Sequence, residues 1–142
     1  MKKIERTALV SYSAMQMFAL VNDVEKYPEF MSGCVGSEVL ARGDDWLEAR
    51  LDLSKLGIQQ SFVTRNHVTP PTMMTIALVS GPFKMLRGAW EFKVLNEQAC
   101  KVSFWLEFEF ANPIFAMAAG KFFEQVASEQ VRSVCERAKR IY

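Results

Sequence analysis

The sequence lacks the residue patterns of a metal centre or a disulfide framework. It has one histidine, His67, and three widely spaced cysteines, Cys34, Cys100 and Cys135, with no CxxC pair among them. Zinc sites and disulfide-rich folds need closely spaced cysteines or histidines. We therefore expect no metal site and three reduced thiols.

A membrane span and a strong charge bias are missing as well. No stretch approaches the roughly 18 apolar residues of a membrane-spanning helix, and no apolar run of signal-peptide length follows Lys2 and Lys3. The formal net charge is only +1, so no long-range field draws the chain to nucleic acid or to an anionic membrane. We expect a cytoplasmic protein that does not bind DNA and whose other contacts depend on local patches.

The sequence does have enough apolar material for a core. Of its 142 residues 50% are hydrophobic, which fits one domain over residues 1–142. Several segments alternate apolar and polar residues, as strands with one buried face do. In WLEARLDL (46–53), for example, every second residue from Leu47 to Leu53 is apolar. We expect strands over 3–11, 35–41, 46–53, 60–68, 73–80, 85–94 and 102–110.

Helix signals follow the first strand and the last. Ser13 is expected to cap a short helix. Asn112 and Pro113 suit the cap and first turn of a long helix. We expect this helix to continue to Ile141 without a break, because a single glycine, Gly120, is tolerated inside a helix. Antiparallel strands with one apolar face need a cover, and this helix is the expected element of sufficient length. The prediction is an α+β fold in which a seven-stranded antiparallel sheet wraps around a long C-terminal helix.

Four unusually apolar loops are expected at one end of this sheet. Turns of an antiparallel meander alternate between its two ends, which gathers YPEF (27–30), KLGI (55–58), GPFK (81–84) and NPIF (112–115). Two interpretations stay open. The loops form the mouth of an apolar cavity, where ligands commonly bind, or they plug the end of the core.

The chain resembles the START-like helix-grip superfamily, and within it the coenzyme Q-binding, polyketide cyclase-like family that includes ribosome association toxins. The resemblance rests on four stretches in the right order: RTALVSYSAMQMFALVNDVEKYPEFMSGC, LSKLGIQQSFVTRN, SGPFKMLRGAWEF and FEFANPIF. One departure is Met31-Ser32, where the family often has Leu-Pro before Gly-Cys. A serine there should relax the turn.

The resemblance implies two functions. The one we expect is binding of a hydrophobic small molecule, such as ubiquinone or another isoprenoid lipid, in support of respiration. The alternative is association with the large ribosomal subunit, which blocks subunit joining. No cofactor is required in either case. The expected lining of the cavity and its mouth is Tyr27, Phe30, Asn66, Leu78, Phe83, Leu86, Trp90, Phe104, Phe108, Met117, Phe122, Phe123 and Val126.

For each of these residues ordinary core packing is the alternative. Asn66 needs hydrogen-bond partners if it is buried. A ligand carbonyl and the protein backbone are the two alternatives for it.

The sequence offers no evident catalytic group. His67 shares the outward face of its strand with Arg65, and Glu107 and Glu109 lie on an outward face too, so we expect no catalytic residue and no enzyme. Contact with ribosomal RNA or a membrane surface needs basic residues. We expect one such group near the mouth at Lys55, Lys84 and Arg87. Two further groups are Lys2, Lys3 and Arg6, and Arg132, Arg137, Lys139 and Arg140.

Overall fold

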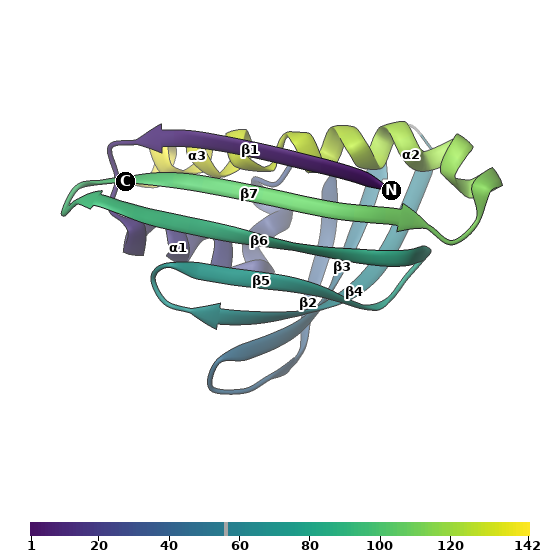
Figure 1. The fold of residues 1–142 in the computed structure, drawn as a ribbon, viewed down its shortest axis with the longest axis horizontal. Coiled ribbons are helices and arrows are strands. Elements are labelled where there is room, and N and C mark those ends of the chain that lie inside the picture. Colours follow the sequence, from purple (N-terminus) through teal and green to yellow (C-terminus); the bar gives the residue numbers. More distant parts are fainter. Residues whose placement is uncertain (56) are drawn as a thin grey trace.

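The computed structural model of the protein describes residues 1–55 and 57–142. Its seven strands form one antiparallel sheet, which confirms the predicted strand number and sheet type (Figure 1). The strands are β1 (Lys2–Val10), β2 (Cys34–Arg42), β3 (Trp46–Lys55), β4 (Ile58–Thr69), β5 (Met73–Ser80), β6 (Phe83–Asn96) and β7 (Ala99–Phe110).

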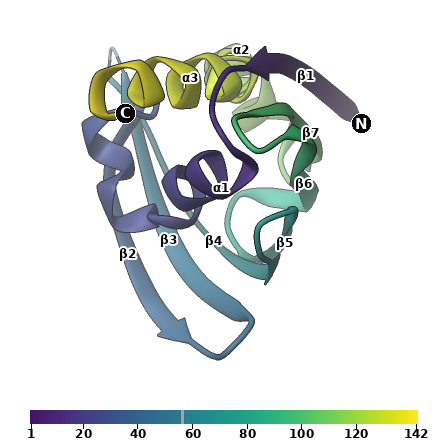
Figure 2. The same ribbon diagram turned by 90° about the vertical axis from the view of Figure 1, so that its left-hand side faces the viewer.

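The strand order is β1-β7-β6-β5-β4-β3-β2. Strands β2 to β7 are therefore a meander, and β1 pairs with β7 at the far edge. Between β1 and β2 lie α1 (Ala14–Asn22) and the 3-10 helix η1 (Val24–Glu29), and after β7 come α2 (Pro113–Ser128) and α3 (Gln130–Ile141). Seen from the end, the sheet curves around α1, with α2 and α3 lying across its open side (Figure 2).

The predicted helix starts are confirmed. Ser13 forms a capping box with Gln16, in which each side chain accepts a hydrogen bond from the other residue's backbone N–H. Asn112 caps α2 by accepting from the backbone N–H groups of Ile114 and Phe115, and Pro113 occupies the first turn.

The prediction of one uninterrupted helix over 113–141 is wrong, because the helix breaks at Glu129. The Glu129 backbone has φ −97° and ψ 0°. Its N–H is shared between the carbonyls of Gln125 and Val126, each 3.2 Å away. The Ser128 hydroxyl donates to the Gln125 carbonyl over 2.8 Å, and such side-chain bonds compete with the helical backbone ladder. The C-terminal cover of the sheet therefore consists of two helices, α2 and α3.

The strands bury the faces that their alternation predicts. Leu47, Ala49 and Leu53 of β3 are buried, and β6 and β7 turn their alternate residues inward in the same way. The alternation of the predicted strand 85–94 puts Val94 on the same face as Trp90 and Phe92, yet Val94 is 55% exposed. A register irregularity between Val94 and Asn96 interrupts the pairing of β6 with β7 there.

No helix in residues 1–55 and 57–142 combines the length and the apolar character that crossing a bilayer requires. The core instead lies between the inner face of the sheet and the helices. Phe92 is 1% exposed and packs edge-on against Phe18 of α1, with ring centroids 6.0 Å apart. This contact holds α1 inside the curve of the sheet.

Replacing this anchor should destabilise the whole fold. We expect Phe92→Ala to lower the free energy of unfolding by about 3–5 kcal/mol, because it removes a buried ring and leaves a cavity. Val94→Ala, two residues further along β6 at an exposed position, should change it by less than about 0.5 kcal/mol. Urea unfolding followed by circular dichroism measures both, and equal losses in the two variants would contradict the assignment.

Candidate functional site

A cavity of about 80 Å³ lies between the inner face of the sheet and the segments that cover it. Its lining comes from η1, the turn after it, β2 to β7, α2 and the start of α3. Several predicted residues line it: Tyr27, Asn66, Leu86, Trp90, Phe104, Phe123 and Val126. Thr64, which the alternation of its strand places inward with Asn66, lines it too. The remaining lining residues were not predicted; they are Met31, Ser32, Cys34, Leu51, Leu53, Phe62, Met74, Ile76, Leu106, Ala127 and Gln130.

Some predicted lining residues lie elsewhere. Phe83 and Phe108 belong to an aromatic cluster in which Phe83 stacks on Phe110 at 4.9 Å and contacts Phe123 at 4.9 Å. The ring of Phe83 in the GPFK loop therefore fills this end of the core, whereas Ile114 in the NPIF loop is 77% exposed. Met117 is 87% exposed on the outer side of α2, so its expected place in the lining is wrong.

The remaining predicted positions are also outside the cavity. Leu78 is half-buried at the end of β5, and Phe122 faces a neighbouring cleft. Phe30 packs edge-on against Tyr27 and lies under the Arg137 guanidinium, 5.1 Å from the ring centroid. Leu56, expected among the mouth loops, lies outside the described residues.

A surface cleft adjoins the cavity beside the turn at residues 32–35. It is lined by Ser32, Gly33, Cys34, Val35, Ser54, Lys55, Phe122, Gln125 and Val126. Three of these, Ser32, Cys34 and Val126, also line the cavity. Gly33 has φ +76°, and a Cβ on it would lie 2.6 Å from a Val126 methyl group. Only glycine fits both the backbone and the space at this boundary.

The thiol at this boundary is not activated. Cys34 is buried and donates weakly to the Gly36 carbonyl at 3.3 Å. Burial raises the pKa of the Cys34 thiol to about 11, the nearby Asp52 carboxylate adds to that rise, and the contact with Gly36 opposes it. The thiol is therefore protonated at neutral pH and acts as an apolar wall.

The turn is tied to the helix break. The Ser32 hydroxyl donates to the Glu129 carboxylate, and the Ser32 backbone N–H donates to the Ser133 hydroxyl over 3.2 Å. A proline at position 32 would have neither the hydroxyl nor the backbone N–H that forms these two bonds. The hydroxyl contact is the main reason why the pKa of the Glu129 carboxyl lies below its ordinary value, with Gln125 and the charge of Arg132 adding to it.

Polar side chains follow the inner face of β4. The Thr64 hydroxyl donates to the Asn66 side-chain oxygen over 3.0 Å, and the Asn66 amide points at the Met74 sulfur 3.7 Å away. Asn66 therefore bonds to side chains rather than to the backbone. Gln60 is 4% exposed, and both polar atoms of its amide are buried without a partner among the described residues. Sequence reasoning missed Gln60, although the alternation through Phe62 places it on this face.

The three basic residues expected near the mouth do not form one group. Lys55 ends β3 at the cleft, and β4 and β5 separate it from Lys84 and Arg87 on β6. Lys84 pairs with Glu109 at 3.5 Å, and Arg87 pairs with Glu107 at 3.1 Å. The expectation fails because turns at the same end of the sheet can belong to strands that lie far apart across its width. The carboxylates of β7 balance the two cations on β6.

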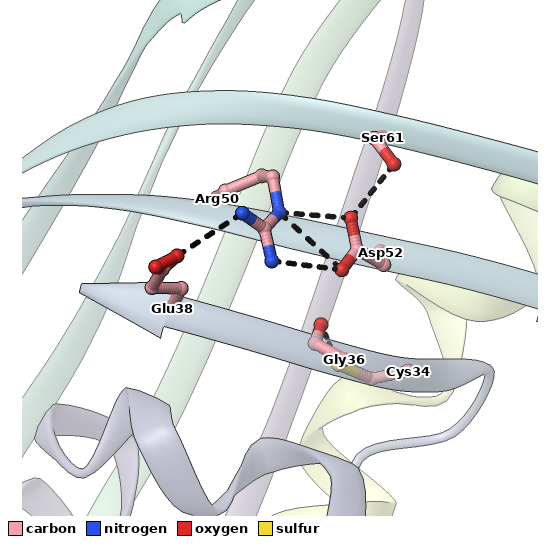
Figure 3. A network of polar contacts seen from close by, with 6 residues as sticks. All are labelled: Cys34, Gly36, Glu38, Arg50, Asp52 and Ser61. Atoms are coloured by element: carbon pink, nitrogen blue, oxygen red, sulfur yellow. Dashed lines mark hydrogen bonds and ion pairs between the residues drawn. The ribbon is translucent and has the colours of Figure 1, made fainter. Parts of the chain in front are cut away.

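The outer face of β2 to β4 carries another ion network (Figure 3). Arg50 pairs with Asp52 at 3.1 Å and with Glu38 at 3.2 Å, and the Ser61 hydroxyl donates to Asp52 over 2.7 Å. The Ser61 bond and Arg50 hold the pKa of the Asp52 carboxyl below its ordinary value against a small effect of burial. Among residues 1–55 and 57–142, no three or more histidine, cysteine or acidic residues are grouped to hold a metal ion.

Charge is unevenly divided over the fold. β1 and α3 carry seven basic residues against Glu5 and Glu136, a net charge of +5, whereas residues 12–55 carry four basic and eight acidic residues, a net charge of −4. The two basic elements lie on the same side of the molecule (Figures 1 and 2). A Lys2–Glu124 ion pair of 3.5 Å joins β1 to α2. We call the surface of β1 and α3 the basic face.

Comparison with known proteins identifies relatives over the whole chain. The sequence pattern of the family described as "Polyketide cyclase / dehydrase and lipid transport" matches residues 10–135. The "Ribosome association toxin RatA" of Vibrio cholerae is 49% identical over 142 residues, which are 100% of this chain and 99% of that protein. The expected family resemblance is confirmed.

Two more distant similarities are to a coenzyme Q-binding protein and to an aromatase/cyclase. The "Coenzyme Q-binding protein COQ10, mitochondrial" of Drosophila melanogaster is 25% identical over 136 residues, 93% of this chain and 56% of that protein. The crystal structure of Zhui aromatase/cyclase from a Streptomyces species superposes with a TM-score of 0.82 over 98% of this chain and 94% of that one. At 17% identity this superposition shows that the two chains share a fold and nothing further.

The tie between Ser32 and Glu129 can be tested by titration. Because the hydroxyl favours the charged carboxylate, Ser32→Ala should raise the pKa of Glu129 towards its ordinary value. In the wild type this bond stabilises the fold at neutral pH, and the contribution is lost as the pH falls through the depressed pKa. The variant should therefore lose less stability on acidification.

Carbon-detected NMR of the Glu129 carboxyl measures the pKa, and urea unfolding at pH 7 and pH 4 measures the stability. Ser54→Ala, at another serine of the cleft, is the matched control and should leave Glu129 unchanged. An unchanged Glu129 pKa in Ser32→Ala would show that the hydroxyl does not stabilise the carboxylate.

Proposed function

We propose, since this chain belongs to the polyketide cyclase/dehydrase and lipid transport family, that it acts by binding rather than by catalysis. Its primary function is to associate with the large ribosomal subunit and so block the joining of the subunits. The observation that carries this proposal is the 49% identity to a ribosome association toxin over the full length of both chains. The identity to the coenzyme Q-binding relative is only 25%.

The charge distribution supports an RNA partner. Proteins bind RNA largely by placing Lys and Arg against phosphates, which releases counterions. The basic face has a net charge of +5 on a chain whose net charge is +1. Such asymmetry orients the chain, so that the basic face meets the phosphates and the acidic half formed by residues 12–55 turns away.

The end of α3 brings two adjacent cations to this contact, and Arg6 of β1 is likewise exposed and in no ion pair among the described residues. Lys139 and Arg140 are exposed, and neither forms an ion pair within residues 1–55 and 57–142. By contrast, Lys2, Lys3, Arg132 and Arg137 each face a carboxylate at 3.2–3.7 Å. An unpaired cation is free to contact phosphate without giving up an existing partner.

Charge reversal at the end of α3 tests the ribosomal function. Lys139→Glu with Arg140→Glu should weaken co-sedimentation with purified large subunits by at least about 10-fold at low salt, and should flatten the dependence of binding on salt. Lys26→Glu with Arg42→Glu makes the same charge change on the acidic half and should have a much smaller effect. Both proteins are checked by thermal unfolding, because charges at a helix end alter stability.

Lys84→Glu with Arg87→Glu tests the predicted contact on β6 in the same assay. These two cations already pair with carboxylates, so we expect a weaker effect than at the end of α3. Equal binding by wild type and the Lys139/Arg140 double variant would contradict the proposed basic face. Failure of the wild type to bind large subunits would contradict the function itself.

A second candidate function is binding of an isoprenoid quinone or similar lipid. The largely apolar cavity lining favours it, as do the family description and the coenzyme Q-binding relative. Ligand pockets for drug-sized molecules usually span about 300–1,000 Å³, whereas the cavity measures about 80 Å³. Binding would therefore require the cavity to widen into the cleft, across the contact between Gly33 and Val126.

Filling the cavity tests this second function. Phe104 lines the cavity and lies against Trp90, with ring centroids 4.6 Å apart. Phe104→Trp should reduce lipid uptake severalfold while leaving the melting temperature within a few degrees of wild type, because the larger ring occupies empty space. Lipid is extracted from gently purified protein and measured by mass spectrometry. A destabilised variant with unchanged uptake would show that Phe104 is tightly packed and overfilled.

A further inference from the structure

The amide of Gln60 is the most costly polar group in the core. Its nitrogen and its oxygen are both buried, and neither has a hydrogen-bond partner among the described residues. Leaving one buried polar atom without a partner costs about 1–3 kcal/mol. A leucine of similar size would avoid this cost, so the fold alone does not account for a glutamine here.

The register of the sheet places Gln60 between the cavity and the cleft. Its cross-strand partner is Leu53, which lines the cavity. The next two residues of β3, Ser54 and Lys55, line the cleft. Phe62, the next inward residue of β4, lines the cavity as well. Gln60 itself lines neither hollow, but its strand register puts it at the level where they adjoin.

On the side of β4 away from β3, the neighbouring strand β5 does not extend as far as Gln60. The pairing of β4 with β5 begins only at Val63 and Ser80, so residues 58–62 extend past the end of β5. Phe62, Phe83 and Phe123 fill the neighbouring space with rings whose centroids are 4.9–5.9 Å apart. These aromatic side chains offer no acceptor or donor to the amide.

We propose that Gln60 is the hydrogen-bonding residue of a ligand site that forms when the cavity and the cleft join, and that it binds a carbonyl group on an otherwise apolar molecule. The ligand's carbonyl accepts from the Gln60 amide nitrogen, and its apolar part occupies the cavity. This inference rests on the second proposed function and adds to it the residue that selects the ligand's polar group.

Three residues, Ser32, Cys34 and Val126, form the boundary between the two hollows. Val126 separates them, and it lines both. Its close partner is Gly33, which has no side chain to move aside. A shift of the 32–35 turn away from α2, with loss of the Ser32 bonds to Glu129 and Ser133, would join the hollows. The other polar pair on this face, Thr64 and Asn66, is already bonded to itself.

Two probes with the same tail separate the hydrogen bond from apolar packing. Decylubiquinone has carbonyl groups on its ring, and decylbenzene has none. Their affinities for wild type, Gln60→Leu and Gln59→Leu are measured by equilibrium dialysis followed by solvent extraction. Gln59 is exposed on the opposite face of β4, so Gln59→Leu is the matched control for the same chemical change one residue away.

We expect Gln60→Leu to weaken decylubiquinone binding by about 10-fold, the worth of one buried hydrogen bond, and to leave decylbenzene binding unchanged or tighter. The variant without ligand should also unfold at a higher urea concentration than wild type, because an unpartnered polar group has been removed. Gln59→Leu should change neither affinity and should not raise the stability.

Three results would overturn the proposal. Equal weakening of both probes, together with lower stability, would show that Gln60 is a packing residue or holds a structural water. Unchanged binding of both probes by Gln60→Leu would show that the amide takes no part. If wild type binds neither probe, the second proposed function fails with it. The ribosomal function is judged separately by co-sedimentation.

Discussion

The inner face of the sheet is apolar along most of its length, and the fold depends on covering that face with the two C-terminal helices. Burying such a surface is the largest favourable term in folding. Phe123 of α2 contacts rings from β4, β6 and β7 at centroid distances of 4.8–5.9 Å. This cluster seals one end of the sheet. The hollows remain further along, where α2 passes the turn at residues 32–35 and the packing is looser.

Much of this fold follows from the sequence because strand alternation is a local signal. The inward faces of β3, β6 and β7 and the caps at Ser13 and Asn112 need no knowledge of distant residues. The break at Glu129 was not predictable in this way. Ser128 and Glu129 are both tolerated inside helices, and the residue that holds Glu129 is Ser32, 97 positions away in the chain.

In the candidate site, too, local sequence signals predict some features, while contacts between distant residues decide the others. Alternation on β4 was sufficient to place Asn66 inside beside Thr64, but the Met74 sulfur that faces its amide nitrogen comes from the pairing of β4 with β5. The grouping of Lys55 with Lys84 and Arg87 failed because a shared end of a sheet says nothing about distance across its width. A carboxylate on the neighbouring strand decides whether a surface lysine is free, and sequence periodicity alone does not give the register.

The two proposed functions meet at the break between α2 and α3. α2 forms a wall of the cavity and the cleft, while α3 carries the cations proposed to contact the ribosome. Ser32 at the cleft bonds to Glu129 at the break and to Ser133 on α3. Moving the 32–35 turn to admit a ligand must therefore strain or break bonds that position α3. Because linkage is reciprocal, a ligand that favours the opened turn would alter ribosome binding, and the ribosome would alter ligand affinity by the same factor.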